Sequence, residues 1–410
     1  MSRKIVISIA IVIIAVICAA AAVLLHTPST SRPTGAKTNV TTTPTATAKS
    51  TVILNIGGAT FPAIQFLSEW IPKFRQKYHI EVEYSQVGSG AGIAGFLSGL
   101  YDIALHDPPM PSYDWEKAVQ EYGPILECPD VVGSVAIIYN IPGLRGTLNL
   151  TGPLLADIFL GKITNWCNRK ILKYNPGLVP ICEKNNFNIP IRVVVRAEAS
   201  GTTYIFTTYL SLVSKDFNET IGPSFLPDWE SAWMKYAHTI IGEKAKRNAG
   251  VALTVMQTKW SIGYVEWSYA VNKHLPVAAL QNPLGQFVKP TAETIMNALE
   301  GAIKMGVLKK FNPLADLAKL GVVKYFLNVP AKDAYPIVSF SFLTVRLHYP
   351  RSELSKALAI YYFLKFIWIE DPHYVKGYLP VPKEIRELCF NALRQHMMVG
   401  NEPITKFARN

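Results

Sequence analysis

Cysteine is scarce in this chain, which has five cysteines among 410 residues. None of them forms a Cys-X-X-Cys pair or a cluster with histidine. Such clusters supply the ligands of structural zinc sites, so the sequence contains no zinc-type ligand set. We expect neither a metal nor a cofactor.

A cluster of basic residues is also missing, although the net charge is +12. Five of the 41 basic residues precede the first acidic residue, Glu69, which leaves 36 basic against 29 acidic residues, a net charge of +7. This excess is spread along the chain, without a basic helix or an alternation of basic and aromatic residues. Nucleic acid is therefore not expected as a partner. A diffuse positive charge is compatible with attraction of small anions.

An enzyme nucleophile lacks its expected surroundings in this sequence. Gly88-Ser89-Gly90 has no strand-to-helix elbow with an identifiable histidine and acid. His106, beside Asp107, is the only tempting base, and a histidine at a strand end is the simpler interpretation. We expect a protein without enzymatic activity, and a surface hydrolase stays open as an alternative.

The N-terminus contains a long apolar run at residues 5–25, interrupted only by Ser8 and preceded by two basic residues. This run is long enough to cross a bilayer, whereas cleaved signals have apolar stretches of roughly 7 to 15 residues. Residues 1–25 are therefore a signal or a membrane anchor. Residues 26–51 are rich in Thr, Ser, Pro and Ala, which is typical of a stalk. We expect an extracytoplasmic protein, anchored at the cell surface.

Four cysteines lie outside the apolar run, at positions 128, 167, 182 and 389. An even number in an exported protein allows two disulfides, with three possible connectivities. Cys167 and Cys182 flank a polar stretch that contains Pro176 and Pro180, and we expect these two cysteines to pair.

From Val52 onward, short apolar strands alternate with amphipathic helices, a pattern that predicts an α/β fold. Strands are expected at residues 52–56, 80–84 and 101–105. After the first strand, Pro62 lies in the first turn of a helix. The buried face of this helix is expected to carry Ile64, Leu67, Trp70, Ile71 and Phe74.

Small or polar residues follow each of these three strands. In open α/β sheets, ligands bind beyond the carboxyl ends of the strands. We therefore place Thr60, Phe61, Ser89 and Asp107 at one rim of the sheet. Each residue alone could simply permit a turn, cap a helix or end a strand.

A further turn with anion-binding chemistry joins a strand at residues 191–195 to a helix. Ser200 and Thr202 fall where the helix begins, and its first N–H groups would point at a ligand. Arg196 adds a fork of donors that fits two oxygens, and Glu198 can hold that fork in place. An N-cap beside a surface Arg–Glu pair is the alternative interpretation. The similar turns upstream favour an oxyanion site.

These motifs resemble a known family, the extracytoplasmic phosphate-binding proteins of ABC-type phosphate importers. The resemblance extends from about Val52 to Pro382. Its motifs are Gly58-Ala59-Thr60-Phe61-Pro62, Gly88-Ser89-Gly90, Asp107, Asn140 to Leu144, Leu155 to Trp166, Arg196 to Thr208, and Ile262-Gly263-Tyr264-Val265-Glu266.

The resemblance implies an α/β periplasmic-binding-protein fold of type II, with two lobes, a hinge and an anion site between the lobes. Lobe I would comprise residues 52–136 and 339–410, and lobe II residues 137–338. Glu198 stands where an Asp is usual and is carried over as a ligand-orienting residue, and Ala199 stands where a Gly is usual. The phosphate ligands would be Thr60, Phe61, Ser89, Asp107, Arg196, Ser200, Gly201 and Thr202.

The resemblance also implies a function: capture of inorganic phosphate and its delivery to an ABC permease in the membrane. An ionised Asp107 can only accept hydrogen bonds, and hydrogen phosphate has a proton to donate, whereas sulfate has none. Asp107 is therefore expected to select phosphate over sulfate. Arsenate, sulfate or another oxyanion stays open as the ligand, as does a surface adhesion role for the stalk.

Overall fold

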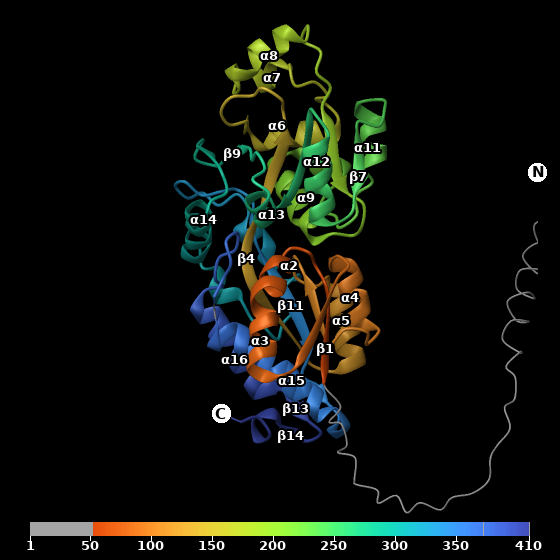
Figure 1. Ribbon diagram of the computed structural model, residues 1–410, viewed down its shortest axis with the longest axis vertical. Helices are drawn as coiled ribbons and strands as arrows, with labels where there is room; N and C mark the ends of the chain where they lie inside the picture. Colours follow the sequence, from red (N-terminus) through yellow and green to blue (C-terminus); the bar gives the residue numbers. More distant parts are fainter. Residues whose placement is uncertain (1–51, 372, 410) are drawn as a thin grey trace, which may run out of the picture. The chain divides into compact units, whose positions relative to one another are not determined.

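The computed structural model describes residues 52–371 and 373–409, which form a mixed α/β structure (Figure 1). These residues belong to one compact unit, Thr51–Asn410. The expected anchor at residues 5–25 and the stalk at 26–51 lie outside the described residues. Within the described part, no helix is both long and apolar enough to cross a membrane.

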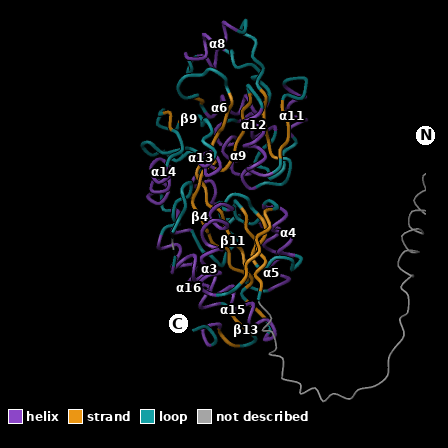
Figure 2. The backbone as a smooth tube through the Cα atoms, viewed as in Figure 1, coloured by secondary structure: helices purple, strands orange, loops and turns teal. Residues whose placement is uncertain are grey.

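An eight-stranded sheet forms the centre of this unit (Figure 2). β1 pairs in parallel with β2 and β3, and β6 pairs in parallel with β7 and β8. The central strands β11 and β4 are antiparallel to their neighbours. In spatial order the strands are β2 (Glu81–Gln86), β1 (Ile53–Gly58), β3 (Ile103–His106), β11 (Val338–Arg346), β4 (Ile125–Asn140), β8 (Ser261–Glu266), β6 (Arg192–Arg196) and β7 (Gly242–Ala245).

The long strand β4 connects the two ends of the sheet. Its residues 125–134 pair with β11, and its residues 135–140 pair with β8. Every residue of β4 except Asn140 is buried. Burial on both faces is consistent with a strand that is mostly apolar without alternation, although Glu127, Asp130 and Ser134 are buried within it.

The three strands expected near the N-terminus are present, with ends that differ by up to two residues. The helix after β1 differs from the expectation, because Leu67 is 43% exposed and Phe66 is buried in its place. The cause is a π-helical turn, Phe66–Trp70, between α2 and α3. A π turn adds a residue to the repeat and so rotates the buried face. The prediction that Leu67 is buried was wrong.

Helices connect the strands, and short strands form two small sheets. The helices are α2 (Ala63–Gln65), α3 (Ile71–Tyr78), α4 (Ser89–Leu97), α5 (Ser112–Tyr122), α6 (Gly152–Leu160), α7 (Arg169–Leu172), α8 (Val179–Lys184), α9 (Gly201–Val213), α10 (Lys215–Thr220), α11 (Trp229–Tyr236), α12 (Arg247–Gln257), α13 (Trp267–Asn272), α14 (Ala292–Lys304), α15 (Leu354–Lys365) and α16 (Lys383–His396). The small sheets contain β10 (Phe287–Val288), β9 (Ala279–Gln281) and β5 (Asn149–Leu150), and β12 (His348–Tyr349), β13 (Met398–Val399) and β14 (Glu402–Pro403).

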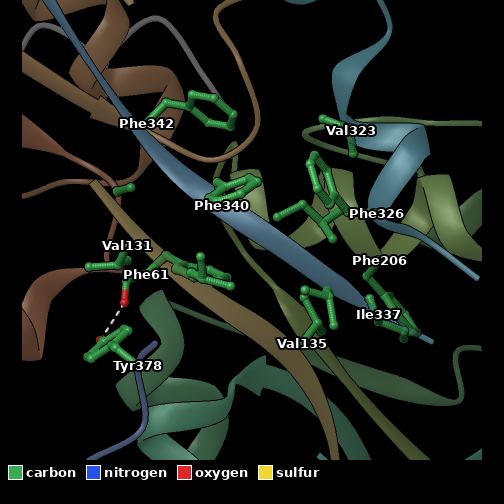
Figure 3. Close-up of a cluster of buried hydrophobic side chains, with 14 of the residues drawn as sticks. Phe61, Val131, Val135, Phe206, Val323, Phe326, Ile337, Phe340, Phe342 and Tyr378 are labelled. Carbon is green, nitrogen blue, oxygen red and sulfur yellow. Dashed lines mark hydrogen bonds between the residues drawn. The ribbon is translucent and has the colours of Figure 1, made fainter. Parts of the chain in front are cut away.

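The hydrophobic core lies along β4 and β11 (Figure 3). Phe340 of β11 packs edge-to-face against Phe326, with ring centroids 4.8 Å apart. Phe61, which follows β1, is fully buried in the same cluster. The turn after β1 is therefore anchored in the core by a large side chain.

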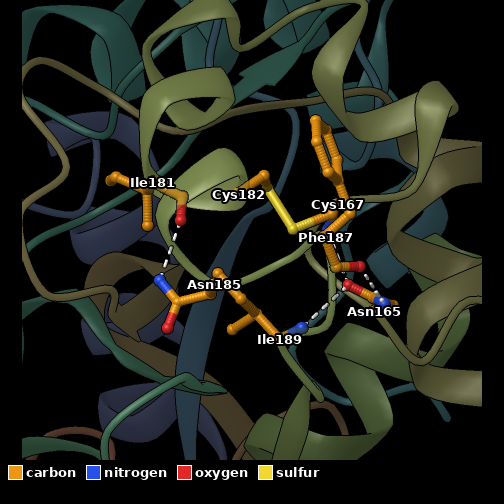
Figure 4. Close-up of a disulfide and its surroundings, with 7 residues drawn as sticks. All are labelled: Asn165, Cys167, Ile181, Cys182, Asn185, Phe187 and Ile189. Carbon is orange, nitrogen blue, oxygen red and sulfur yellow. Dashed lines mark hydrogen bonds between the residues drawn. A yellow bond between two sulfur atoms is a disulfide. The ribbon is translucent and has the colours of Figure 1, made fainter.

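Two disulfides lie within the described residues. Cys128 of β4 is bonded to Cys389 of α16, and Cys167 is bonded to Cys182 of α8. The second bond is the pair expected from the sequence, and it closes a stretch with a separation of 15 residues (Figure 4). Asn165 supports this stretch, because its side chain accepts from the N–H of Cys167 and donates to the carbonyl of Phe187.

Candidate functional site

The eight residues expected to bind phosphate come from turns at strand ends and from one helix start. Ser200 is the N-cap of α9, and its hydroxyl accepts from the N–H of Thr203. The N-cap role, which was the alternative interpretation of this turn, is therefore present. It does not exclude ligand binding, because a hydroxyl that accepts a hydrogen bond can still donate its own proton. All eight residues are buried: Thr60, Phe61, Ser89, Asp107, Arg196, Ser200, Gly201 and Thr202.

Hydrogen bonds join the turns after β1, β2 and β3. The carbonyl of Gly58 accepts from the N–H groups of Val87 and Gly88, at 3.1 and 2.8 Å. The N–H of Ala59 donates to the carbonyl of Leu105 at 2.7 Å. Thr60, Ser89 and Asp107 therefore belong to one connected group of turns, as their strand-end positions suggested.

The start of α9 lies directly against this group. Ser89 Oγ accepts from the N–H of Gly201 at 3.2 Å and from the N–H of Asp107 at 3.3 Å. Thr202 Oγ1 donates to Asp107 Oδ2 at 3.3 Å. The approach is close enough to require glycine, because a Cβ on Gly201 would lie 1.2 Å from the carbonyl oxygen of Asp107.

An ion pair orients the guanidinium of Arg196. Glu198 Oε1 accepts from Arg196 Nε at 2.9 Å and from Nη2, and also from the N–H of Arg247 at 2.9 Å. The Arg196 side chain is 2% exposed. Its Nη1 is buried without a hydrogen-bond partner, so one edge of the fork remains available for a ligand.

Asp107 contributes the complementary group. Its Oδ1 is buried without a partner, while Oδ2 is occupied by Thr202. Burial raises the pKa of Asp107 to about 8, against the opposing effects of Arg196, Thr202 and Ser89. Burial desolvates the carboxylate and therefore favours the protonated form of this carboxyl, whereas the ionised Asp107 expected from the sequence stays a prediction for the phosphate-bound site.

The site thus combines several donors with one carboxyl that exchanges a proton. Ser89 already accepts two bonds, so its own proton must be donated. Arg196 and the helix start add positive potential. Within the described residues, no group of three or more His, Cys, Asp or Glu could hold a metal. The arrangement suits a tetrahedral oxyanion that carries a proton.

Comparison with known proteins identifies the family. A model of the PBP superfamily domain matches residues 40–365. The phosphate-binding protein PstS of Methanocaldococcus jannaschii is 38% identical over 351 residues, which cover 84% of this chain and 86% of the relative. The chain belongs to the PstS family of the PBP superfamily. The phosphate-binding protein PstS of Pasteurella multocida is 32% identical, over 80% of this chain and 86% of its own.

Solved structures agree on the fold of this PstS family member. A human phosphate-binding apolipoprotein has a TM-score of 0.63 at 20% identity, over 85% of this chain and 97% of its own. A phosphate-binding protein from Stenotrophomonas maltophilia has a TM-score of 0.57 at 18% identity, over 83% and 93%. The fold is the two-lobed α/β fold of periplasmic binding proteins, as expected.

Two residues beside the site carried no recognisable signal in the sequence. Asn248 donates to Thr60 Oγ1 at 3.1 Å, and Tyr269 donates to the Thr60 carbonyl at 3.1 Å. Both lie on helices far along the chain from Thr60. An asparagine or a tyrosine inside a helix has many ordinary roles, so only their position identifies them.

Proposed function

We propose that this protein binds inorganic phosphate outside the cytoplasm and delivers it to an ABC importer. One observation carries the proposal: Arg196 Nη1 and Asp107 Oδ1 are both buried without partners, in a cluster that contains the expected binding residues. A buried donor and a buried acceptor of this kind cost free energy unless a ligand pairs with them. Hydrogen phosphate offers oxygens to the first and can share one proton with the second.

The chemistry of binding follows from the donors. Arg196, the hydroxyls of Ser89 and Ser200, and the N–H of Thr202 at the start of α9 would donate to phosphate oxygens. Asp107 would share one proton with the anion, whichever partner brings it. The family names of the relatives support phosphate as the ligand. The relatives are binding proteins, and the chain is a solute-binding protein without enzymatic activity.

We further propose the lobe division 52–136 plus 339–410 against 137–338. Two strands support it, because β4 passes the boundary near Ala136 and β11 begins beside the boundary at Ser339. Two extended strands at the boundary between the lobes can act as a hinge. The bonds from Gly201 to Ser89 and from Thr202 to Asp107 would then cross from one lobe to the other. A phosphate that contacts both lobes would favour the closed state.

For the N-terminus we propose anchoring of the protein to the cell membrane through residues 5–25. The apolar run and the stalk at residues 26–51 support this proposal. The anchor would keep the binding unit near the permease. Separation of membrane and soluble fractions of the expressing cells tests it, and full-length protein in the soluble fraction would contradict it.

A titration of the purified protein tests the main proposal. Phosphate, arsenate and sulfate are added separately while tryptophan fluorescence and calorimetric heat are followed. We expect saturable phosphate binding and much weaker sulfate binding at pH 8. Absence of a saturable response to phosphate would contradict the proposal. Preference for arsenate or sulfate would assign the site to that anion.

A further inference from the structure

Three consecutive carbonyl groups in the turn after β1 are each held by a tyrosine. Tyr84 of β2 donates to the carbonyl of Ala59. Tyr269 of α13 donates to the carbonyl of Thr60 at 3.1 Å. Tyr378, between α15 and α16, donates to the carbonyl of Phe61 at 2.6 Å (Figure 3). Tyrosines from three distant segments therefore fix this turn, which we call the residue 59–61 turn.

The direction of these carbonyls determines the direction of the neighbouring N–H groups. In a planar trans peptide the C=O and the following N–H point in opposite directions. Because the Thr60 carbonyl points at Tyr269, the N–H of Phe61 points away from it. Likewise, the N–H of Thr60 points away from Tyr84. Burial raises the pKa of Tyr84 and Tyr269, so both hydroxyls keep the proton that they donate.

Asn248 donates a hydrogen bond to the Thr60 hydroxyl of the same turn. This side chain is fully buried in the first turn of α12. Its Oδ1 accepts from the N–H of Glu266 at 3.0 Å, which a carboxamide nitrogen could not do. The amide orientation is therefore fixed, and Nδ2 must be the atom that donates to Thr60 Oγ1 at 3.1 Å.

A hydroxyl that accepts from Asn248 has one proton left, and that proton must go to another acceptor. If Asn248 offered an oxygen instead, the Thr60 hydroxyl could donate to it and be lost to the ligand. The backbone N–H of Glu266 thus fixes the amide orientation of Asn248, and Asn248 fixes the direction of the Thr60 hydroxyl proton. No step in this relay depends on direct contact between Asn248 and the ligand.

We propose that Asn248 is a positioning residue, which makes the Thr60 hydroxyl an obligate donor to the bound phosphate. Tyr269 has the matching role for the peptide between Thr60 and Phe61. This inference rests on the proposed phosphate function. With the proposed lobes, Asn248 and Tyr269 lie on lobe II and Thr60 lies on lobe I. The Thr60 donor would then acquire its fixed direction only as the lobes close.

A double-mutant cycle on the full-length protein tests the relay. Phosphate dissociation constants are measured by calorimetry for wild type, Thr60→Val, Asn248→Ala and the double variant. We expect Thr60→Val to weaken binding roughly tenfold, because it removes one hydrogen bond to a charged ligand. Asn248→Ala should weaken binding by up to the same factor, because the Thr60 hydroxyl loses the contact that fixes its direction. Since Asn248 acts through Thr60, the double variant should bind within about twofold of Thr60→Val. A general structural defect would weaken binding further in the Thr60→Val background as well.

Asn140→Ala is the matched control. Asn140 also donates through a carboxamide to α12, but at the opposite end of the helix, to the carbonyls of Val255 and Met256. We expect this variant to bind phosphate within about twofold of wild type. A loss equal to that of Asn248→Ala would show that any weakening of α12 has the same effect and would overturn the proposal.

A second variant covers the case in which Asn248→Ala does not fold. Asn248→Asp keeps the side-chain size and the acceptor for Glu266 but presents Thr60 with an acceptor. If the added negative charge acted alone, it would weaken phosphate binding by the same factor with or without the Thr60 hydroxyl. The proposal therefore expects a smaller loss in the Thr60→Val background, and equal losses would contradict it. If wild type itself does not bind phosphate, the proposed function fails, and the inference fails with it. If wild type binds phosphate but the Asn248 and Thr60 substitutions weaken binding independently, only the inference is overturned.

Discussion

At the scale of single residues, the proposed choice between oxyanions depends on the proton of Asp107. Burial raises the pKa of this carboxyl to about 8. Below that pH the neutral acid can donate to sulfate, and above it the carboxylate only accepts. Hydrogen phosphate retains a proton at either pH. We expect the ratio of phosphate to sulfate affinity in wild type to rise roughly tenfold between pH 6 and pH 9.

The variant Asp107→Asn should lose this dependence, because an amide does not titrate. At pH 9 it should also have a smaller phosphate-to-sulfate ratio than wild type. Calorimetric titrations with both anions at pH 6, 7.5 and 9 measure these ratios. A wild-type ratio that does not change with pH would exclude Asp107 as the residue that discriminates.

A second carboxyl affects stability rather than binding. Glu127 is fully buried, and burial raises its pKa to about 8, against the opposing hydrogen bond from the Met110 N–H. The pKa of Glu127 is higher in the folded protein than in the unfolded chain. The contribution of this carboxyl to stability is therefore fully present at low pH and is lost as the pH rises towards 8. Each pH unit in that window costs about 1.4 kcal/mol.

Replacement of Glu127 by Gln should therefore flatten the decline of stability with pH. We expect the variant to melt above wild type at pH 8, and the difference in melting temperature to narrow by about half as the pH falls to 6, since it disappears only near the unfolded pKa of 4.5. Neighbouring His106, whose pKa burial lowers to about 4, has the opposite dependence at acid pH, so thermal melts are compared between pH 6 and 8. Glu293→Gln, at an exposed position of α14, is the control. Its melting temperature should fall with pH as steeply as that of wild type.

At the scale of elements, the start of α9 must reach the turn after β3. A Cβ on Gly201 would lie 1.2 Å from the Asp107 carbonyl oxygen, which no side-chain adjustment can relieve. We expect Gly201→Ala to keep the fold but to weaken phosphate binding at least about 100-fold, because the turn and the helix cannot meet. Calorimetry measures the affinity, and circular dichroism measures the fold.

Gly250→Ala in α12 is the control for this substitution. The nearest atoms to a Cβ there lie 3.7 Å away, in ordinary contact. Alanine is also the better helix former, by about 1 kcal/mol. The variant should therefore bind phosphate normally and melt at an equal or higher temperature. Normal phosphate binding by Gly201→Ala would show that the observed approach of α9 is not required.

At the scale of the whole molecule, the disulfide Cys128–Cys389 joins segments with a sequence separation of 261 residues. A cross-link over a long loop removes more entropy from the unfolded chain, about 5 kcal/mol against about 3 for the short Cys167–Cys182 loop. Paired alanine substitution of Cys128 and Cys389 should lower the melting temperature more than paired substitution of Cys167 and Cys182. Neither pair lies in the site, and phosphate affinity should stay within about twofold. A larger drop in melting temperature after substitution of Cys167 and Cys182 would contradict this order.

The sequence alone determined the local units of this protein. Strand-to-turn-to-helix units around Thr60, Ser89 and Asp107 were predictable because alternation, turn chemistry and helix starts are encoded by residues a few positions apart. Ser200 could be placed at the start of α9 for the same reason. Residue types at strand ends suggested the binding residues, and the resemblance to the phosphate-binding family supplied their roles.

Only the tertiary structure decided which distant side chains support these units. The π-helical turn that exposes Leu67, the raised pKa of Asp107, and the contacts of Asn248 and Tyr269 with Thr60 all depend on neighbours far along the chain. Desolvation and hydrogen-bond direction depend on position in space, and no local pattern records them. The sequence therefore specified the groups that can bind an oxyanion, and the packing of the chain determined their protonation and direction.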